Sequence, residues 1–152
     1  MDYLSQKKYN ELKKELEELL SNGRRELAQQ LDEAKSLGDL KENAEYHQAR
    51  DDQAKLESRV LKLEELLKNA TIIKKSKTDE VQVGVTVEIA KKLASKTATY
   101  EIVGTEDADI FKGKIDLNAP LAKAMMGKKK GDIFDFKLPN DEVVSYRIIN
   151  IK

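Results

Sequence analysis

The chain has 152 residues, with 28 Lys and Arg balanced by 28 Asp and Glu, and it contains neither Cys nor Trp. The balanced charge excludes the bulk positive field of many nucleic-acid-binding proteins, and the absence of Cys excludes disulfides and thiolate metal sites. A composition of 37% charged and 5% aromatic residues favours a long exposed helical pair over one large globule. The N-terminus is polar and no segment approaches about 18 apolar residues, so we expect a soluble cytoplasmic protein that does not engage a membrane.

Residues 1–75 carry two runs of helical periodicity. Apolar residues recur at steps of three and four, a spacing typical of a coiled coil, apart from a weak stretch around Gly23. Between the runs, Gly38 is a good helix stop and Asp39 a good helix start, which predicts an antiparallel helical hairpin with its tip near 36–46. The apolar positions are Tyr9, Leu12, Leu16, Leu19, Leu27, Leu31 and Ala34, then Tyr46, Ala49, Leu56, Val60, Leu63 and Leu67, with Gln53 as a polar member.

After residue 75 the hydrophobic period changes to two. The segment Pro120–Met126 predicts one short helix, with Pro120 in its first turn and Gly127 just past its end. The pattern therefore predicts an α+β chain: a coiled-coil hairpin at 1–75 and an antiparallel-sheet domain with one short helix at 76–152, joined by a polar connector at 74–79. Strand patterns lie at 81–83, 85–89, 97–103, 132–138 and 143–151.

The acids Asp39 and Glu42 at the predicted tip have two interpretations. In the structural one, Asp39 caps the second helix and Glu42, three residues later, completes something close to a capping box. In the functional one, the two carboxylates share a Mg²⁺ ion through their oxygens. Two carboxylates form an incomplete site for this ion, so a partner would have to supply further ligands. The interpretations are compatible, because a capped and rigid Asp39 is a better-positioned ligand.

The segment Gly38–His47, with Ala34-Lys35 before it and Ala49-Arg50 and Gln53 after it, resembles the tip motif of the Gre family of bacterial transcript-cleavage factors. The resemblance spans nearly the whole chain and implies a coiled-coil hairpin followed by an FKBP-like domain. At one position the chain departs from the family pattern, since Ala119 stands where relatives often carry Ser before the Pro. In the second half the similar segments are 100–104, 106–109 and 118–128, which ends shortly before Gly131-Asp132.

The resemblance implies a non-enzymatic transcription elongation factor. We expect a monomer, because the helical pair already buries its own apolar seam. Such factors insert their hairpin into the secondary channel of bacterial RNA polymerase and stimulate the polymerase to cut backtracked RNA, releasing a short fragment from the nascent RNA 3′ end. By position, Asp39 and Glu42 match the acids that assist this catalysis. They would be metal ligands only within the complex, where Mg²⁺ is shared with the polymerase active site, and we expect the isolated chain to bind none.

Further residues are implied to contact the partners. Lys35, Lys41 and Arg50 would form a small basic patch for the RNA, or else be solvated charges or partners of Asp51 and Asp52. Asn43 and Tyr46 could order the tip or touch the RNA 3′ end, although Tyr46 also fits the packed seam, and His47 reads as a surface or packing residue. Polymerase docking is expected around the short helix, which could also simply be buried, at Pro120, Leu121, Met125 and Gly127.

Three other functions deserve comparison. A Gre-like inhibitor of the same channel, without cleavage stimulation, would have a changed tip sequence, and the intact stretch 39–43 argues against it. A binding-only coiled coil would leave the tip motif without a role. A prolyl isomerase, suggested by the FKBP-like domain alone, needs a deep aromatic pocket. For such a pocket the domain offers only Phe111, Phe134, Phe136, Tyr100 and Tyr146.

Overall fold

The computed structural model describes residues 1–75 and 77–152, which form two compact units. One unit is the hairpin, Tyr9–Ala70, and the other combines Met1–Lys8 with Thr71–Lys152. The sequence boundary at residue 75 placed Met1–Lys8 with the helices, whereas the structure groups them with the sheet. Within the predicted connector 74–79, Ser76 lies outside the described residues. No helix in the described part of the chain is long and apolar enough to cross a membrane.

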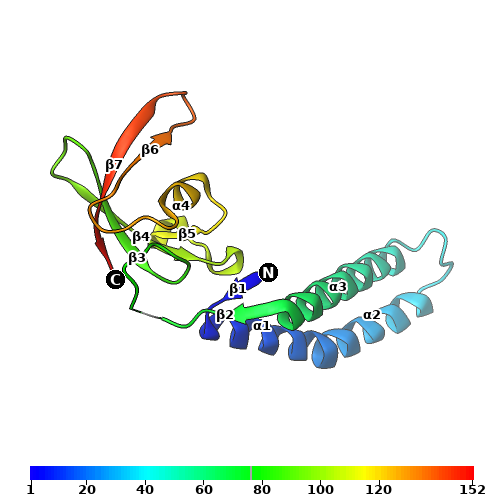
Figure 1. The fold of residues 1–152 in the computed structure, drawn as a ribbon. Helices are drawn as coiled ribbons and strands as arrows, with labels where there is room; N and C mark the ends of the chain where they lie inside the picture. The colour runs from blue at the N-terminus through cyan, green and yellow to red at the C-terminus, as the bar shows by residue number, and fades with distance from the viewer. Residues whose placement is uncertain (76) are drawn as a thin grey trace. The chain divides into compact units, whose positions relative to one another are not determined.

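The hairpin has two helical arms (Figure 1). The first arm runs through α1 (Gln6–Glu18), a π-helical segment (Leu19–Gly23) and α2 (Arg24–Ser36), and α3 (Ala44–Asn69) returns along it. The predicted seam is confirmed in part, because several of its apolar side chains on both arms are buried. These are Leu12, Leu31 and Ala34 from the first arm, and Ala49, Leu56, Val60 and Leu63 from the second.

The weak stretch of the seam around Gly23 coincides with the π-helical segment. A π turn holds an extra residue, so it shifts the apolar positions that follow onto a new face of the helix. Glycine suits this place because a Cβ on Gly23 would lie only 2.9 Å from Cδ1 of Leu56. The π turn therefore lets two imperfectly matched apolar runs face the same partner helix.

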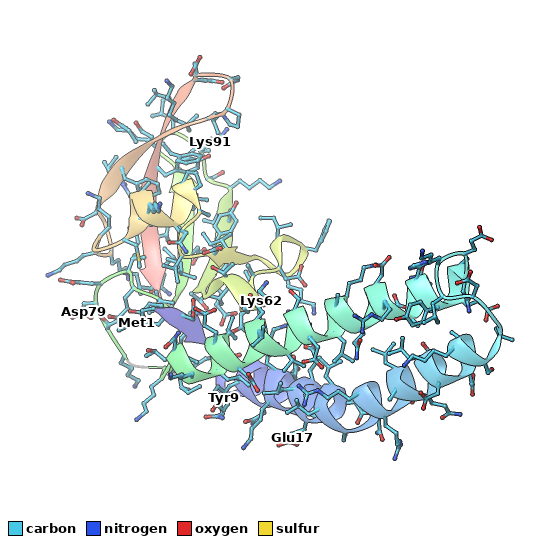
Figure 2. The ribbon with its side chains drawn as sticks, turned by 90° about the vertical axis from the view of Figure 1, so that its right-hand side faces the viewer. Met1, Tyr9, Glu17, Lys62, Asp79 and Lys91 are labelled. Carbon is cyan, nitrogen blue, oxygen red and sulfur yellow. The ribbon has the colours of Figure 1, made fainter. Side chains whose placement is uncertain are left out.

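Two bidentate ion pairs join the arms on either side of this segment. Glu15 accepts hydrogen bonds of 2.7 and 2.9 Å from Arg59, and Glu57 accepts two of 2.9 Å from Arg24. The hydrogen bonds to Glu57 raise the pKa of Arg24 above its ordinary value. Most other charged side chains of the arms, such as Glu17 and Lys62, extend into solvent (Figure 2).

The other unit is built on a mixed five-stranded sheet in the order β5-β4-β3-β7-β6. The α+β prediction is confirmed, but the sheet is not wholly antiparallel, because β5 runs parallel to β4. The crossover between them contains two 3₁₀ turns, Thr105–Asp107 and Ile110–Lys112. The strands are β3 (Thr86–Lys91), β4 (Thr97–Val103), β5 (Lys114–Asp116), β6 (Ile133–Lys137) and β7 (Val143–Ile151).

The short helix α4 (Pro120–Met125) contacts β6 and closes the core of this unit, as predicted from its Pro and Gly boundaries. The predicted strand at 81–83 is wrong. The Val81 backbone bonds with Gly127 and Lys128 after α4 instead, and Gly84, at φ +92°, turns the chain before β3 begins. The buried core side chains are Val81, Val85, Val87, Ile89, Ile102, Ile115, Ala122, Met125, Phe134 and Ile148.

The N-terminal strand β1 (Asp2–Leu4), which the sequence did not reveal, pairs with β2 (Ala70–Ile72). It lies so close to Gly104 that a Cβ there would collide with the Tyr3 carbonyl oxygen. Ser5 then donates its N–H and its Oγ–H to the Asp107 carboxylate, at 2.8 and 2.7 Å. The Ser5 Oγ also accepts the Lys8 N–H, so Ser5 caps α1 while it anchors the strand.

Candidate functional site at the hairpin tip

The tip is a short loop between the end of α2 at Ser36 and the start of α3 at Ala44. Gly38 follows the helix end with φ +135°, a conformation that L side chains rarely adopt. A Cβ there would meet nothing within 4 Å, so backbone conformation, and not space, accounts for the glycine. The prediction of Gly38 as the helix stop is confirmed.

The residue that caps α3 is Asn43, and the prediction that Asp39 is the cap is wrong. Asn43 has extended backbone angles, and its Oδ1 accepts the Tyr46 N–H at 3.1 Å. Its Nδ2 donates to the carbonyl of Ala34 at 2.5 Å, which links the cap to α2. An Asp side chain can accept but, when ionised, cannot donate, so only an amide performs both tasks here. The capping box of Asp39 and Glu42 therefore does not form.

Both tip acids lie in the loop and are exposed. Asp39 Oδ1 accepts the Lys41 N–H at 3.0 Å, and Oδ2 has no hydrogen bond to any residue that the structure describes. No hydrogen bond or ion pair of the Glu42 carboxylate occurs among the described residues. The two side chains thus present carboxylate oxygens that are available to a ligand.

These oxygens suit a hard cation such as Mg²⁺, which takes six oxygen ligands in proteins. In the described ranges, no group of three or more His, Asp or Glu side chains is placed to hold a metal ion. Asp39 and Glu42 can supply only part of such a coordination shell. The donor set therefore fits a metal whose other ligands come from a partner.

The three predicted basic residues are all exposed: Lys35 in the last turn of α2, Lys41 in the loop and Arg50 in α3. Arg50 donates to the Oε1 of its helix neighbour Gln53 at 3.2 Å. None of the ion pairs within residues 1–75 and 77–152 involves these three side chains, so the alternative pairing with Asp51 and Asp52 is not observed. Their charges remain available to a ligand.

Tyr46 and His47 begin α3 next to the cap. Tyr46 is half-buried, as its seam position suggested, and its ring meets the His47 ring edge-on at 5.7 Å. His47 is exposed, and its Nε2 lies 3.0 Å from the carbonyl oxygen of Lys41. Sequence analysis assigned His47 no specific role, and a contact with a main-chain carbonyl leaves no pattern in the sequence that could have suggested it.

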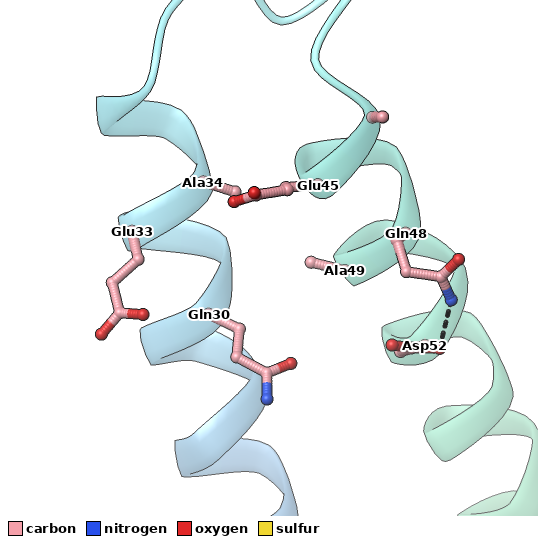
Figure 3. Close-up of a pocket in the computed structure, with 8 residues that line it drawn as sticks. Gln30, Glu33, Ala34, Glu45, Gln48, Ala49 and Asp52 are labelled. Atoms are coloured by element: carbon pink, nitrogen blue, oxygen red, sulfur yellow. Dashed lines mark hydrogen bonds between the residues drawn. The ribbon is translucent and has the colours of Figure 1, made fainter.

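A groove of about 370 Å³ lies between α2 and α3 behind the tip (Figure 3). Small side chains form its floor, with Ala34 and Ala49 buried on facing helices. Its walls carry three carboxylates and two amides, and Gln48 donates to Asp52 at 2.9 Å. The predicted basic residues do not line the groove, so this face of the hairpin is acidic. The polar wall residues are Gln30, Glu33, Glu45, Gln48 and Asp52.

The predicted docking residues of the globular unit differ in exposure. Pro120 and Gly127 are exposed and Leu121 is half-buried, so all three can meet a partner. Met125 is 0% exposed and belongs to the core, so its prediction as a contact residue is wrong. A fully buried side chain packs α4 against the core and cannot contact another protein while the chain is folded.

A separate cavity of about 490 Å³ lies within the globular unit, between the β3–β4 turn, α4 and the end of β6. Tyr100, Phe136 and Tyr146 contribute its aromatic lining and Leu121 lies at its helix side. Phe134 is instead stacked in the core and Phe111 is 99% exposed. Of the five aromatic side chains available for an isomerase pocket, three line this cavity.

Comparison with known proteins assigns both halves of the chain. The family described as "Transcription elongation factor, N-terminal" matches residues 2–72, and "Transcription elongation factor, GreA/GreB, C-term" matches residues 75–152. The chain is 41% identical over 152 residues to the transcription elongation factor GreA of Chloroherpeton thalassium, covering 99% of this chain and 96% of that protein.

A second relative, the GreA of Thioalkalivibrio sulfidiphilus, is 41% identical over 146 residues, covering 94% and 92% of the two chains. A solved GreA/GreB factor from Nitrosomonas europaea matches with a TM-score of 0.45 and 19% identity, covering 99% of this chain and 97% of that chain. With both family models matched end to end, the chain belongs to the GreA/GreB family of transcription elongation factors.

Proposed function

We propose that this elongation factor stimulates a backtracked bacterial RNA polymerase to cleave its own transcript, with the hairpin tip placed in the secondary channel. The observation that carries the proposal is the pair of exposed acids, Asp39 and Glu42, on a loop at the end of a two-helix arm. Among the described residues, the one group that their oxygens bind is the backbone N–H of Lys41. Exposed acids at the end of a long arm can reach into the active site of a partner protein.

In this proposal, Asp39 and Glu42 supply oxygen ligands to a metal ion in the polymerase active site. A Mg²⁺ ion, when bound, favours either the attacking water or the leaving oxygen in phosphodiester hydrolysis. Asp39 offers Oδ2 while its Oδ1 stays on the Lys41 N–H, and Glu42 offers both oxygens. Either carboxylate can also accept a hydrogen bond from the attacking water and orient it. In this proposal the tip supplies ligands to a metal site completed by the polymerase, and the polymerase carries out the cleavage.

The exposed cations near the tip would hold the extruded RNA. Lys35, Lys41 and Arg50 have no ion-pair partner in the described chain, so binding a phosphate breaks no internal ion pair. Asn43 contributes by fixing the loop, since its amide is already occupied on both sides. Tyr46 is half-buried beside His47, and its exposed part is available to the RNA 3′ end.

The globular unit would dock on the polymerase through the exposed surface of α4 and its flanks. Pro120, Leu121 and Gly127 form this surface, and buried Met125 holds the helix against the sheet. The factor would work as a monomer, because its hairpin buries the apolar seam within one chain. It would act in the cytoplasm, where the bacterial polymerase transcribes.

The test uses a stalled, backtracked elongation complex that carries 3′-labelled RNA. The native chain with Mg²⁺ should release short labelled fragments, and Asp39→Ala/Glu42→Ala should release none above the polymerase alone. The matched control, Glu11→Ala/Glu26→Ala, removes the same charge from exposed helix positions and should retain activity. Slowed elongation without fragments from the native chain would contradict the proposal and indicate channel inhibition instead.

A further inference from the structure

The tip loop has no buried side chain among its described residues. Residues 37–42 are all exposed, including Leu37 at 65% and Leu40 at 41%. Exposed loops of this kind are mobile unless hydrogen bonds fix them. Metal ligands act only when their side chains are held close to the productive geometry. The hydrogen bonds that fix this loop therefore determine how well Asp39 and Glu42 are positioned.

One of these bonds reaches the backbone between the acids. Nε2 of His47 lies 3.0 Å from the carbonyl oxygen of Lys41, which belongs to the peptide unit that leads into Glu42. On the other side, the Lys41 N–H is held by Asp39 Oδ1 at 3.0 Å. Both main-chain polar groups of Lys41 are therefore bonded, the N–H to Asp39 and the carbonyl to His47.

His47 itself is well anchored. It lies in the first turn of α3, where its N–H donates to the Asn43 carbonyl at 3.1 Å and its ring meets Tyr46 edge-on. Asn43 in turn donates to Ala34 at the end of α2. A continuous series of contacts thus runs from the two helices to the peptide unit that bears Glu42.

We propose that His47 is a positioning residue for transcript cleavage, whose Nε2–H bond to the Lys41 carbonyl holds Glu42 in the orientation that the metal requires. This inference rests on the proposed function. A carbonyl oxygen can only accept, so Nε2 must carry the hydrogen. His47 touches neither metal nor RNA in this role and acts through the backbone of its neighbour.

Removal of the imidazole should lower the cleavage rate without weakening polymerase binding. His47→Ala keeps the Asn43 cap and the exposed acids, so α3 and the charge of the tip are retained. In the backtracked complex at saturating factor, we expect the single-turnover cleavage rate to fall about ten-fold, the scale seen when groups that orient metal ligands are removed. The factor concentration for half-maximal rate should stay within about two-fold of native, because the docking surfaces are unchanged.

Two further variants separate positioning from general structure. His47→Gln retains an N–H donor of similar reach and should restore most of the native rate. Gln48→Ala removes the next side chain, whose bond to Asp52 stays within α3, and should cleave at the native rate. Equal loss in His47→Ala and His47→Gln would contradict the proposal, as would a native rate in His47→Ala or a change confined to the half-maximal concentration.

A second measurement needs no polymerase. Nitrogen-15 spectra of the neutral His47 ring in the full chain should show the hydrogen on Nε2, and a hydrogen on Nδ1 would overturn the inference. If the native chain cleaves and His47→Ala cleaves equally well, only this inference fails. If the native chain releases no fragments, the proposed function fails and His47 has no cleavage to position.

Discussion

Asn43 donates its Nδ2 hydrogen to the carbonyl oxygen of Ala34 and so ties the end of one helix to the cap of the next. The same side chain accepts the Tyr46 N–H through Oδ1. One amide therefore closes the hairpin tip, and the shape of the loop that carries Asp39 and Glu42 depends on it.

Asn43→Asp should separate these two bonds. Aspartate caps helices as well as asparagine does, so α3 should begin at the same residue, but the carboxylate faces the Ala34 carbonyl without a hydrogen to share. We expect the tip amides at 37–42 to exchange with solvent faster than in the native chain, measured by hydrogen–deuterium exchange. Unchanged exchange would show that the bond to Ala34 does not hold the loop.

Asn43→Ala should lose both bonds. The cap contributes about 1 kcal/mol and the second hydrogen bond about as much. The free energy of unfolding of the hairpin, measured with denaturant, should therefore fall by about 1–2 kcal/mol. Lys41→Ala removes an exposed side chain from the same loop and should unfold like the native chain. An equal loss in both variants would contradict the role given to the amide.

Gly104→Ala should displace the N-terminal strand. A Cβ at this position collides with the carbonyl oxygen of Tyr3, a backbone atom that cannot rotate away. We expect a loss of about 1–3 kcal/mol in the free energy of unfolding and faster amide exchange in β1. Thr105→Ala, at the exposed next residue, serves as the control and should change neither quantity.

Met125→Ala and Leu121→Ala should differ in kind. Met125 is fully buried, so its truncation should cost about 2–5 kcal/mol of unfolding free energy. Leu121 is half-buried within α4, so its truncation should mainly raise the Kd for RNA polymerase, measured by competition in the cleavage assay. A native Kd for Leu121→Ala would remove that residue from the docking surface.

The sequence predicted the parts of the fold that follow from periodicity. Heptad spacing placed the seam, and β-branched runs bounded by turn residues placed β4 and β7 at their observed limits. The sequence analysis missed β1, β2 and β5, which have three residues each and too little pattern to detect. The parallel pairing of β5 with β4 was also out of reach, because it depends on how the intervening turns fold.

At the site, the sequence identified which acids stand at the tip but not what shapes the loop around them. Asp39 and Asn43 are both good caps, and local preference alone cannot decide between them. The choice depends on Asn43 reaching Ala34 across the hairpin, a tertiary contact. His47 was missed for the same reason, since its partner is a backbone carbonyl and carries no sequence signal. Met125 was misjudged because a motif does not tell exposed positions from buried ones.

The glycine at 38, the amide at 43 and the imidazole at 47 hold the tip by backbone conformation and by bonds to main-chain atoms. Among the described residues, no hydrogen bond or ion pair involves the side chain of Lys41 or Glu42, whereas the main chain of Lys41 bonds to Asp39 and to His47. The chemistry displayed at these two positions is thus separable from the arm that delivers it. A chain with other residues at 41 and 42 would present different functional groups at the same place. Point substitutions at these two positions can therefore change the chemistry of the tip while the hairpin keeps its structure.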